Sequence, residues 1–370
     1  MERQSNMHRR NFFSRLALAA TAAAQGNAQS SNRSAGSRIL AWAHADKDFG
    51  GPRDPMRRRL DQARQAGIEV LLPFVHSTPQ EDQAWYNSGL RGFVCKDLLS
   101  RLSELGREAG IEVHPILGGT TDVGQDAAAR RRSSYLSGKP GGSRQDGRFC
   151  ASDASSRTGP PRIAVDILDH HDVPGLHLDY MRYLDTGNGL KWPCRCAACR
   201  RRYRVVFGKE EITAADLQTP GAVYKYLQFR NGNIAGSVEQ IHAIARQRGV
   251  KLSLAARADY FGAALVEGQD WADWARRGWL DFICPMNYTT SREEHRRLLA
   301  TQLSLVGRAC PVYSGVGRKW SAGELPTAEM ILQAEDALSL GAQGIAIFQF
   351  SALSEEDFTA LRSFSRSAGG

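Results

Sequence analysis

Three cysteines within a six-residue stretch have the spacing of a metal site. Cys194, Cys196 and Cys199 form a Cys-x-Cys-x-x-Cys motif, and three thiolates need a fourth ligand to complete the tetrahedral coordination of zinc. Cys150, in the long connection that precedes the motif, is the candidate for that ligand. Because a closed four-thiolate site has no open coordination position, we expect a structural Zn²⁺ that holds loops together.

Other cysteine chemistries fit this pattern less well. Disulfides form in exported proteins, but Cys-x-Cys and Cys-x-x-Cys pairs rarely have the geometry of a bridge in a fold with a large core. The spacings also fit an iron–sulfur cluster poorly. A zinc ribbon that binds nucleic acid is the remaining alternative, since arginines flank the motif. These arginines would equally offset the negative charge of four thiolates around Zn²⁺; they are Arg195, Arg200, Arg201, Arg202 and Arg204.

A carboxylate stands at the end of an apolar run. Residues 173–183 begin with a Pro-Gly turn, continue as apolar sequence and end with Asp179, Tyr180 and Arg182. In a parallel barrel, polar residues at the C-terminal end of a strand point into the mouth, where catalysis takes place. Arg182 would favour the ionised form of Asp179. On spacing alone the two residues form either part of a catalytic site or a structural ion pair.

Short apolar runs alternate with helical stretches over most of the chain. Several runs are rich in Val, Ile and Leu without alternation, as parallel strands buried on both faces should be. The predicted strands cover residues 39–45, 68–75, 111–117, 176–180, 250–256, 280–288, 310–316 and 342–350. The predicted helices include residues 54–65, 96–108, 222–248, 293–307 and 327–340. This order predicts the α/β class and a single (β/α)8 TIM barrel.

The connections between these elements refine the prediction. Those after the third and fourth strands, 118–172 and 182–249, are much longer than the others, and barrel enzymes build their sites from such loops. An open doubly wound sheet is the alternative, but the sequence has no Gly-x-Gly-x-x-Gly after the first strand and no Walker A motif. It also lacks the Gly-x-Ser-x-Gly and His-Glu-x-x-His motifs of serine hydrolases and metalloproteases.

Three segments resemble known carbohydrate-active proteins. The run Gly-Leu-His-Leu-Asp-Tyr-Met-Arg-Tyr at 175–183 resembles the strand-four signature of glycosyl-hydrolase-like family 10. The Gln-Asp-Trp-x-x-Trp motif at 269–274, followed by Asp281 and Pro-Met-Asn-Tyr at 285–288, is similar to a second segment of that family. The cysteine motif with an upstream Cys resembles the zinc site of family 42 β-galactosidases, which supports Cys150. The resemblance spans residues 38–350 and implies a carbohydrate-active barrel with Asp179 as leading catalytic carboxylate.

A glycosidase usually needs a second carboxyl group. The two groups stand roughly 5–5.5 Å apart for retention and roughly 6.5–9.5 Å apart for inversion. The seventh strand, where many barrel glycosidases carry the partner, has no acid in this sequence. We therefore predict Asp259, just after the fifth strand, as the partner of Asp179. Glu267, Asp270 and Asp46 are the alternatives to Asp259. Asp281 is expected to be a structural residue at the opposite rim.

Aromatic and polar residues at predicted strand ends suit a sugar ligand. Sugars bind through stacking on aromatic faces and through hydrogen bonds from polar groups. The predicted substrate-binding residues are Trp42, His44, His76, His114, Tyr180, Arg182, Arg257, Asn287, Tyr288 and Gln349. The three cysteines outside the metal motif, Cys95, Cys284 and Cys310, are expected to be buried core thiols.

The N-terminal stretch explains much of the positive charge. The chain of 370 residues has a net charge of +9, which could indicate a nucleic-acid or membrane partner. However, residues 1–38 carry six arginines against one glutamate. Arg9 and Arg10 precede two Phe and a short apolar run, an arrangement that resembles a twin-arginine export signal. A basic amphipathic helix or a single anchor is the alternative, but the apolar run is too short to span a bilayer.

These observations predict an export signal at 1–28, a polar linker at 29–37 and a barrel at 38–370. We expect a periplasmic or secreted protein that engages the twin-arginine export machinery, acts on a poly- or oligosaccharide, binds no nucleic acid and has no stable membrane anchor after cleavage. Asp179 with its neighbours favours a glycoside hydrolase. The missing acid on the seventh strand favours the second hypothesis, a non-catalytic carbohydrate-binding barrel.

Overall fold

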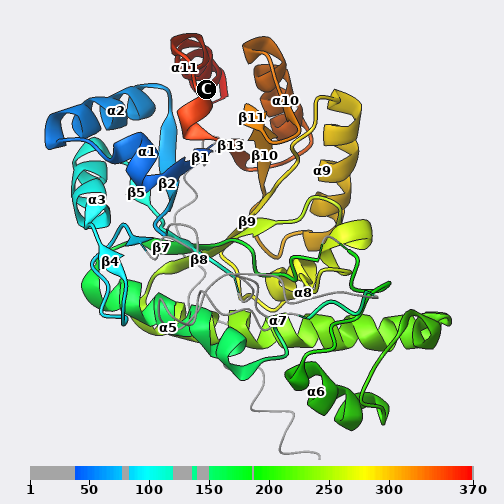
Figure 1. Cartoon of the computed structure of the whole chain (residues 1–370). Helices are drawn as coiled ribbons and strands as arrows, with labels where there is room; N and C mark the ends of the chain where they lie inside the picture. Colours follow the sequence, from blue (N-terminus) through cyan, green and yellow to red (C-terminus); the bar gives the residue numbers. More distant parts are fainter. Residues whose placement is uncertain (1–37, 77–82, 120–135, 140–149, 186, 369–370) are drawn as a thin grey trace, which may run out of the picture. The chain divides into compact units, whose positions relative to one another are not determined.

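Eight parallel strands close into a barrel in the computed structural model, which describes residues 38–76, 83–119, 136–139, 150–185 and 187–368 (Figure 1). Neighbouring strands follow the order β10-β13-β1-β2-β6-β7-β8-β9, and β5 precedes β6 along β2. Their bounds are β1 Arg38–His44, β2 Ile68–Phe74, β5 Glu112–Val113, β6 Ile116–Leu117, β7 Gly175–Leu178, β8 Lys251–Ala256, β9 Phe282–Pro285, β10 Tyr313–Gly317 and β13 Gly344–Phe348. The first and last strands of this order meet where the Ile283 N–H donates to Pro311 O at 3.0 Å.

A helix follows each barrel strand, so the structure confirms the single (β/α)8 barrel. These helices are α2 Arg53–Gln65, α3 Leu98–Ala109, α5 Ala154–His170, α7 Pro220–Arg248, α8 Trp271–Arg276, α9 Arg292–Val306, α10 Thr327–Ser339 and α11 Glu355–Ala368. Smaller elements lie in the connections: α1 Ala45–Phe49, β3 Gln83–Ala84, β4 Val94–Cys95, α6 Ala197–Phe207, β11 Lys319–Trp320 and β12 Gly323–Glu324. The predicted strands and helices each correspond to an observed element, with ends shifted by a few residues.

The long connections contain helices that the sequence did not predict. α5 lies in the connection before the fourth barrel strand, and it has Pro160 and Pro161 inside it. Proline removes a backbone donor and normally ends a helix, which is why its sequence reads as a loop. In Figure 1, α5 and α7 run side by side, and the Ser237 hydroxyl on α7 donates to the Arg157 carbonyl oxygen on α5 at 2.9 Å.

Alternate strand residues fill the inside of the barrel. This interior cluster is apolar and buried, and consists of Leu40, Trp42, Val70, Leu72, Ile116, Ala255, Phe282, Cys284, Tyr313 and Ala346. At the N-terminal ends of the strands, the Arg38 guanidinium donates to Glu69 at 2.9 Å and to Glu112 at 3.0 Å. Lys251 also contacts Glu112, at 2.9 Å. Because ion pairs and apolar side chains fill this end, a site must form at the C-terminal ends of the strands.

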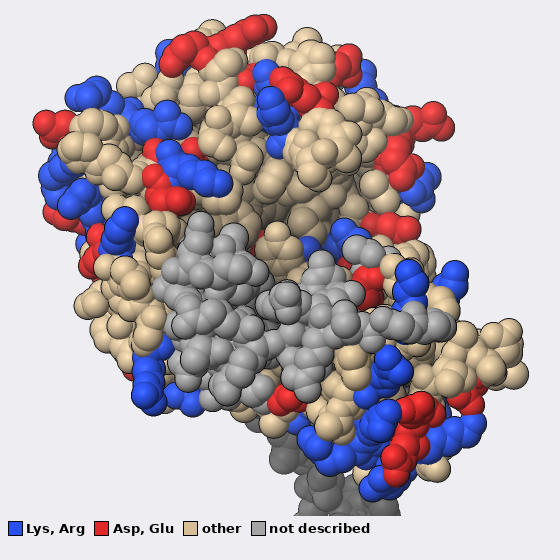
Figure 2. Space-filling view, viewed as in Figure 1, with Lys and Arg blue, Asp and Glu red and all other residues tan. Residues whose placement is uncertain are grey.

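The described surface carries mixed charge. In Figure 2, Lys and Arg residues intermingle with Asp and Glu over the described part of the face in view. No helix within the described ranges is long and apolar enough to cross a membrane. The predicted export signal and linker, residues 1–37, lie outside the residues that the structure describes.

Candidate active site and cysteine cluster

Asp179 stands at the mouth of the barrel, directly after β7. Its backbone N–H donates to Leu117 O at 3.1 Å, which continues the parallel pairing of β6 and β7 by one residue. The carboxylate is only 5% exposed and accepts hydrogen bonds from the Tyr180 N–H at 2.6 Å and from Arg182 Nη1 at 3.2 Å. Burial raises the pKa of Asp179, while the Arg182 guanidinium opposes this rise.

The turn after Asp179 has an unusual backbone. Tyr180 has a φ of 55°, in the left-handed region that residues other than glycine rarely adopt. Gly119 lies against it, and a Cβ at Gly119 would be 1.7 Å from the Tyr180 carbonyl oxygen. Within this turn the Arg182 guanidinium lies 4.8 Å from the centre of the Tyr180 ring. The sharp turn therefore brings Tyr180 and Arg182 to the side of Asp179.

Glu267 supplies a second buried carboxylate at this site. It lies in the loop between β8 and α8 and is 2% exposed. Its Oε2 is 3.7 Å from Arg182 Nε, and Arg257 Nη2 donates to its Oε1 at 2.9 Å. Burial raises the pKa of Glu267, while Arg257 and Arg182 lower it. Arg182 thus contacts both Asp179 and Glu267.

The structure does not give Asp259 the place that we predicted for it. Asp259 is exposed, and its carboxylate accepts from the Gly262 N–H at 2.9 Å, so it caps a short helical turn after β8. Asp270, one of the alternatives, accepts from the Tyr260 hydroxyl at 2.6 Å and caps α8. Local capping explains both acids, because a short polar side chain at the start of a helix satisfies otherwise unpaired N–H groups. Glu267, the other loop alternative, is the acid in contact with Arg182.

An aromatic wall, formed by Trp42, Tyr288 and Phe348, lies inside the barrel. The Trp42 indole N–H donates to His177 Nε2 at 3.1 Å. The ring proton of His177 is therefore on Nδ1, which donates to Ser253 Oγ at 2.8 Å. Burial lowers the pKa of His177 to about 3, so the ring is neutral. This chain fixes Trp42, whose ring centre is 5.9 Å from that of Tyr288.

The Tyr288 hydroxyl is the polar group of this wall that a ligand could use. Its ring stacks on Phe348 with a centroid distance of 4.8 Å. Its oxygen is buried and has no hydrogen-bond partner among the residues that the structure describes. Burial raises the pKa of Tyr288 well above its usual value, and the charge of Asp179 adds to the rise. Within the described residues, this neutral hydroxyl is therefore available to donate to a ligand.

The histidines and Gln349 predicted at the rim divide into two sets. His44 stacks on Phe74 at 5.0 Å, and its Nε2 lies 3.2 Å from Gln349 Oε1. His76 follows β2 and packs edge-on against the Tyr86 ring at 5.1 Å. These residues follow the C-terminal ends of their strands, as predicted.

His114 and Asn287 are not at the mouth of the barrel. His114 is buried between β5 and β6, where its Nε2 lies 2.9 Å from Glu112, near the N-terminal ends of the strands. Asn287 is buried behind β9, and its Nδ2 donates to Gln302 on α9 and to Ser314 on β10, both at 3.0 Å. Both predictions of a substrate contact are corrected by this geometry. The sequence places these residues near strand ends but does not show toward which end or face they point.

A hairpin after β10 adds an aromatic residue that the sequence analysis did not select. Trp320 is partly buried and lies 6.4 Å from Tyr288 between ring centres. Glycines flank its ring, since a Cβ at Gly317 or Gly323 would lie 2.7 or 2.5 Å from it. Arg318 anchors the hairpin to Asp357 at 2.9 Å. The sequence feature that could have identified Trp320 is a Trp between two glycines, just after a predicted strand.

The four predicted metal ligands lie together. The sulfur atoms of Cys150, Cys194, Cys196 and Cys199 are buried and lie within 4.8 Å of one another. Each of three backbone N–H groups, those of Leu136, Ser152 and Cys199, donates to one of these sulfurs at 3.4 Å. Such donors stabilise thiolates. Four thiols in one cluster fit a tetrahedral metal site, and a single cluster is unlike two separate disulfides.

The arginines near this cluster do not act as we expected. Arg200 pairs with Glu211, and Arg204 pairs with Glu210, while Arg202 lies over the Phe229 ring at 5.4 Å. The predicted charge compensation therefore fails for these residues. The three backbone N–H groups described above are donors to the sulfurs. Of the remaining cysteines, Cys284 and Cys310 are buried as predicted, whereas Cys95 on β4 is exposed.

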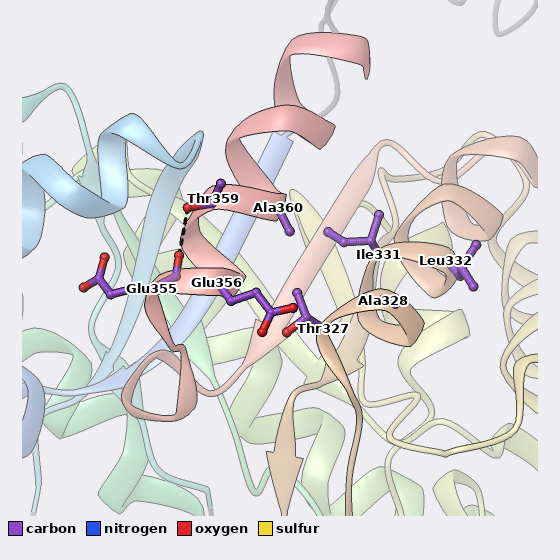
Figure 3. Close-up of a pocket in the computed structure, with 8 residues that line it drawn as sticks. All are labelled: Thr327, Ala328, Ile331, Leu332, Glu355, Glu356, Thr359 and Ala360. Atoms are coloured by element: carbon purple, nitrogen blue, oxygen red, sulfur yellow. Dashed lines mark hydrogen bonds between the residues drawn. The ribbon is translucent and has the colours of Figure 1, made fainter.

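A groove lies between α10 and α11, lined by residues of these two helices (Figure 3). Its volume is about 720 Å³. Apolar side chains of Ile331, Leu332 and Ala360 meet the acidic Glu355 and Glu356 there. The groove contains none of the predicted site residues.

Comparisons with solved structures agree with this architecture. The glycoside hydrolase domain of PgaB (BpsB) from Bordetella bronchiseptica has 17% identity and a TM-score of 0.70, with 89% of this chain and 98% of that chain covered. The catalytic domain of β-amylase from Paenibacillus polymyxa has 10% identity and a TM-score of 0.60, with 90% and 98% covered. Gan42B, a GH42 β-galactosidase from G. stearothermophilus, has 11% identity and a TM-score of 0.62, with 90% and 56% covered.

At these identities the similarity shows a common fold, that of barrels found in glycoside hydrolases. No family model and no curated protein matches the sequence.

Proposed function

We propose that this protein is an exported glycoside hydrolase that acts on a poly- or oligosaccharide, with Asp179 and Glu267 as its carboxyl pair. The observation that carries the proposal is the position of Arg182 between two buried carboxylates at the barrel mouth. Its contacts of 3.2 and 3.7 Å keep the two contacting carboxylate oxygens no more than about 9 Å apart, which does not exceed the upper limit of roughly 9.5 Å for glycosidase carboxyl pairs.

The surroundings of the two carboxyl groups favour a different catalytic role for each. Arg257 and Arg182 both contact Glu267, which favours its ionised form as base or nucleophile. Burial raises the pKa of both carboxyl groups, but Asp179 is in contact with one guanidinium, that of Arg182, and Arg257 acts on it only through its charge. Asp179 therefore suits the group that gives a proton to the leaving oxygen. The Tyr288 hydroxyl would donate to the sugar, and the buried Trp42 ring packs edge-on against the Tyr288 ring.

The test compares three matched variants on a panel of poly- and oligosaccharides. Asp179→Asn and Glu267→Gln should each lower kcat/KM by about 10³-fold or more, the size of effect expected when one of the two carboxyls is removed. Asp259→Asn serves as control, because it changes an exposed acid in the same loop as Glu267. Wild-type activity that survives in either of the first two variants would contradict the assignment.

The second candidate function is a carbohydrate-binding barrel without catalysis. The clamp of Arg257 and Arg182 on the buried Glu267 favours it, because such a carboxylate could serve as a structural ion. Glycan binding by wild type and Asp179→Asn, with no turnover by either, would select this candidate over the hydrolase.

We also propose that the cysteine cluster holds a structural Zn²⁺. The support is the four buried sulfurs within 4.8 Å of one another and their N–H donors, since Zn–S bonds of about 2.3 Å need sulfurs gathered at this distance. Bound zinc would tie the loop of Cys150 to the start of α6. Metal analysis of the purified protein together with thiol titration tests this; four free thiols without metal would exclude it.

The export route is a proposal from the sequence alone. Six arginines among residues 1–38 and the Arg9–Arg10 pair before an apolar run support a twin-arginine signal at 1–28. A periplasmic location would follow. Replacing Arg9 and Arg10 by Lys should retain the precursor in the cytoplasm, as measured by cell fractionation; unchanged export would rule out that pathway.

A further inference from the structure

A line of buried hydrogen bonds runs from the cysteine cluster to the side chain of Tyr183, the neighbour of Arg182 in the carboxyl site. Cys199 Sγ lies 3.3 Å from Ser152 Oγ. The Asn233 side chain, on α7, donates to Ser152 Oγ at 3.1 Å and to the Tyr183 hydroxyl at 2.8 Å. Asn233 is fully buried, and Ser152 and Tyr183 are nearly so. The line therefore runs through the core, without solvent-exposed members.

Tyr183 carries the line into the carboxyl site. Its backbone N–H donates to the Glu267 carbonyl oxygen at 2.7 Å, and it is the residue after Arg182. The Arg230 guanidinium covers its ring at 4.0 Å and donates to Asp185 at 2.7 Å. Held in this way, Tyr183 fixes both the loop of Glu267 and the guanidinium that contacts Asp179.

We propose that Asn233 and Tyr183 are positioning residues that make the cysteine cluster the anchor of the Asp179–Glu267 pair. The role of these residues in catalysis rests on the proposed function. Their role in holding the loop of Glu267 and Arg182 rests on the contacts described above. When the four thiolates hold a metal, the Ser152 hydroxyl donates to Cys199 Sγ and its lone pair accepts from Asn233. The orientation of Asn233 then follows from the cluster, and that of Tyr183 follows from Asn233.

The chain offers a matched pair of variants to test this. Tyr183→Phe removes one hydroxyl from the line and keeps the ring under Arg230. Tyr203→Phe removes an equally buried hydroxyl, which lies 3.4 Å from the Tyr226 hydroxyl beside the same cluster but outside the line. Both substitutions leave the cysteines unchanged, so the full-length proteins loaded with Zn²⁺ are compared at equal metal content.

The first readout is hydrogen exchange of the peptides that cover residues 180–185 and 264–271. Loss of a hydrogen bond worth about 1 kcal/mol predicts about fivefold faster exchange there in zinc-loaded Tyr183→Phe. Zinc removal from the wild-type protein should raise exchange in the same peptides, and Tyr203→Phe should match wild type. Unchanged exchange in Tyr183→Phe, or an equal rise in Tyr203→Phe, would overturn the proposal.

The second readout is the pH profile of kcat on any glycan that wild type hydrolyses. Tyr183→Phe should shift the profile and lower kcat about tenfold with little change in KM, because it misplaces Arg182 between the carboxyl groups. A KM effect without a pH shift counts against a positioning role. If no glycan is hydrolysed, the proposed function fails while the exchange experiment still decides the coupling.

Discussion

The cysteine cluster and the carboxyl site are built in opposite ways. Three of the four cysteines lie within six residues, and the start of α6 brings their sulfurs together locally. Asp179 and Glu267 are separated along the chain by α6, the long helix α7, β8 and a loop, and only the closed barrel brings both to Arg182. The first site depends on local spacing, while the second depends on the whole fold. We expect the first to govern stability and the second to govern activity.

The largest expected effect separates the two sites directly. Cys196→Ser should lower the free energy of unfolding by more than about 3 kcal/mol, because losing one ligand weakens a metal site whose binding energy stabilises the fold. Asp179→Asn should change it by less than about 1 kcal/mol, since burial already disfavours the charge of Asp179. Denaturant unfolding of zinc-loaded proteins measures both.

Cys95→Ser is the control for the cysteine substitution. Cys95 is exposed, with only long contacts of 3.7 and 3.8 Å to carbonyl oxygens, so it should shift the free energy of unfolding by no more than about 0.5 kcal/mol. A larger loss in Asp179→Asn than in Cys196→Ser would reverse the comparison between the sites.

The same contrast decides what the sequence could predict. The barrel, the cluster of Cys150 with the other cysteines, and Asp179 at a strand end follow from periodicity and spacing. The choice between Asp259 and Glu267 does not, because both lie in one loop and their roles depend on whether the side chain caps a turn or reaches Arg182. A helix with two internal prolines, α5, was missed because tertiary packing outweighs local propensity.

A buried polar cluster outside both sites gives the next prediction. Asn287→Ala should lower the free energy of unfolding by about 1–3 kcal/mol, because it removes the buried hydrogen bonds that Asn287 makes with Gln302 and Ser314. Gln349→Ala at the barrel mouth is the control and should cost less than about 1 kcal/mol, since within the described residues its side chain forms a hydrogen bond with His44 alone. Urea unfolding compares them; equal losses would return Asn287 to the candidate ligand contacts.

Acidic pH should lower the stability of the fold, because protonation of His177 is unfavourable at its buried position next to Trp42. The folded pKa is about 3, below the usual value of about 6.5, so the unfolded chain binds a proton that the folded protein refuses. Stability is therefore complete above about pH 6.5 and declines as the pH falls toward 3, by about 2 kcal/mol between pH 7 and pH 5. His177→Gln retains hydrogen-bonding groups but does not titrate, and its unfolding free energy should lack that part of the decline. An equal decline in both proteins would show that other groups cause it.

The last prediction concerns Tyr288, where we expect a very small change in stability but a clear change in activity. Its hydroxyl is buried without a partner in the described part of the chain, so Tyr288→Phe removes an unsatisfied group and should leave the free energy of unfolding within about 0.5 kcal/mol of wild type. If the hydroxyl donates to the bound sugar beside Asp179, the same substitution should lower kcat/KM by about tenfold or more. Paired unfolding and kinetic measurements test both statements. A marked loss of stability with full activity would show that Tyr288 is a core residue. Another group would then have to donate to the bound sugar.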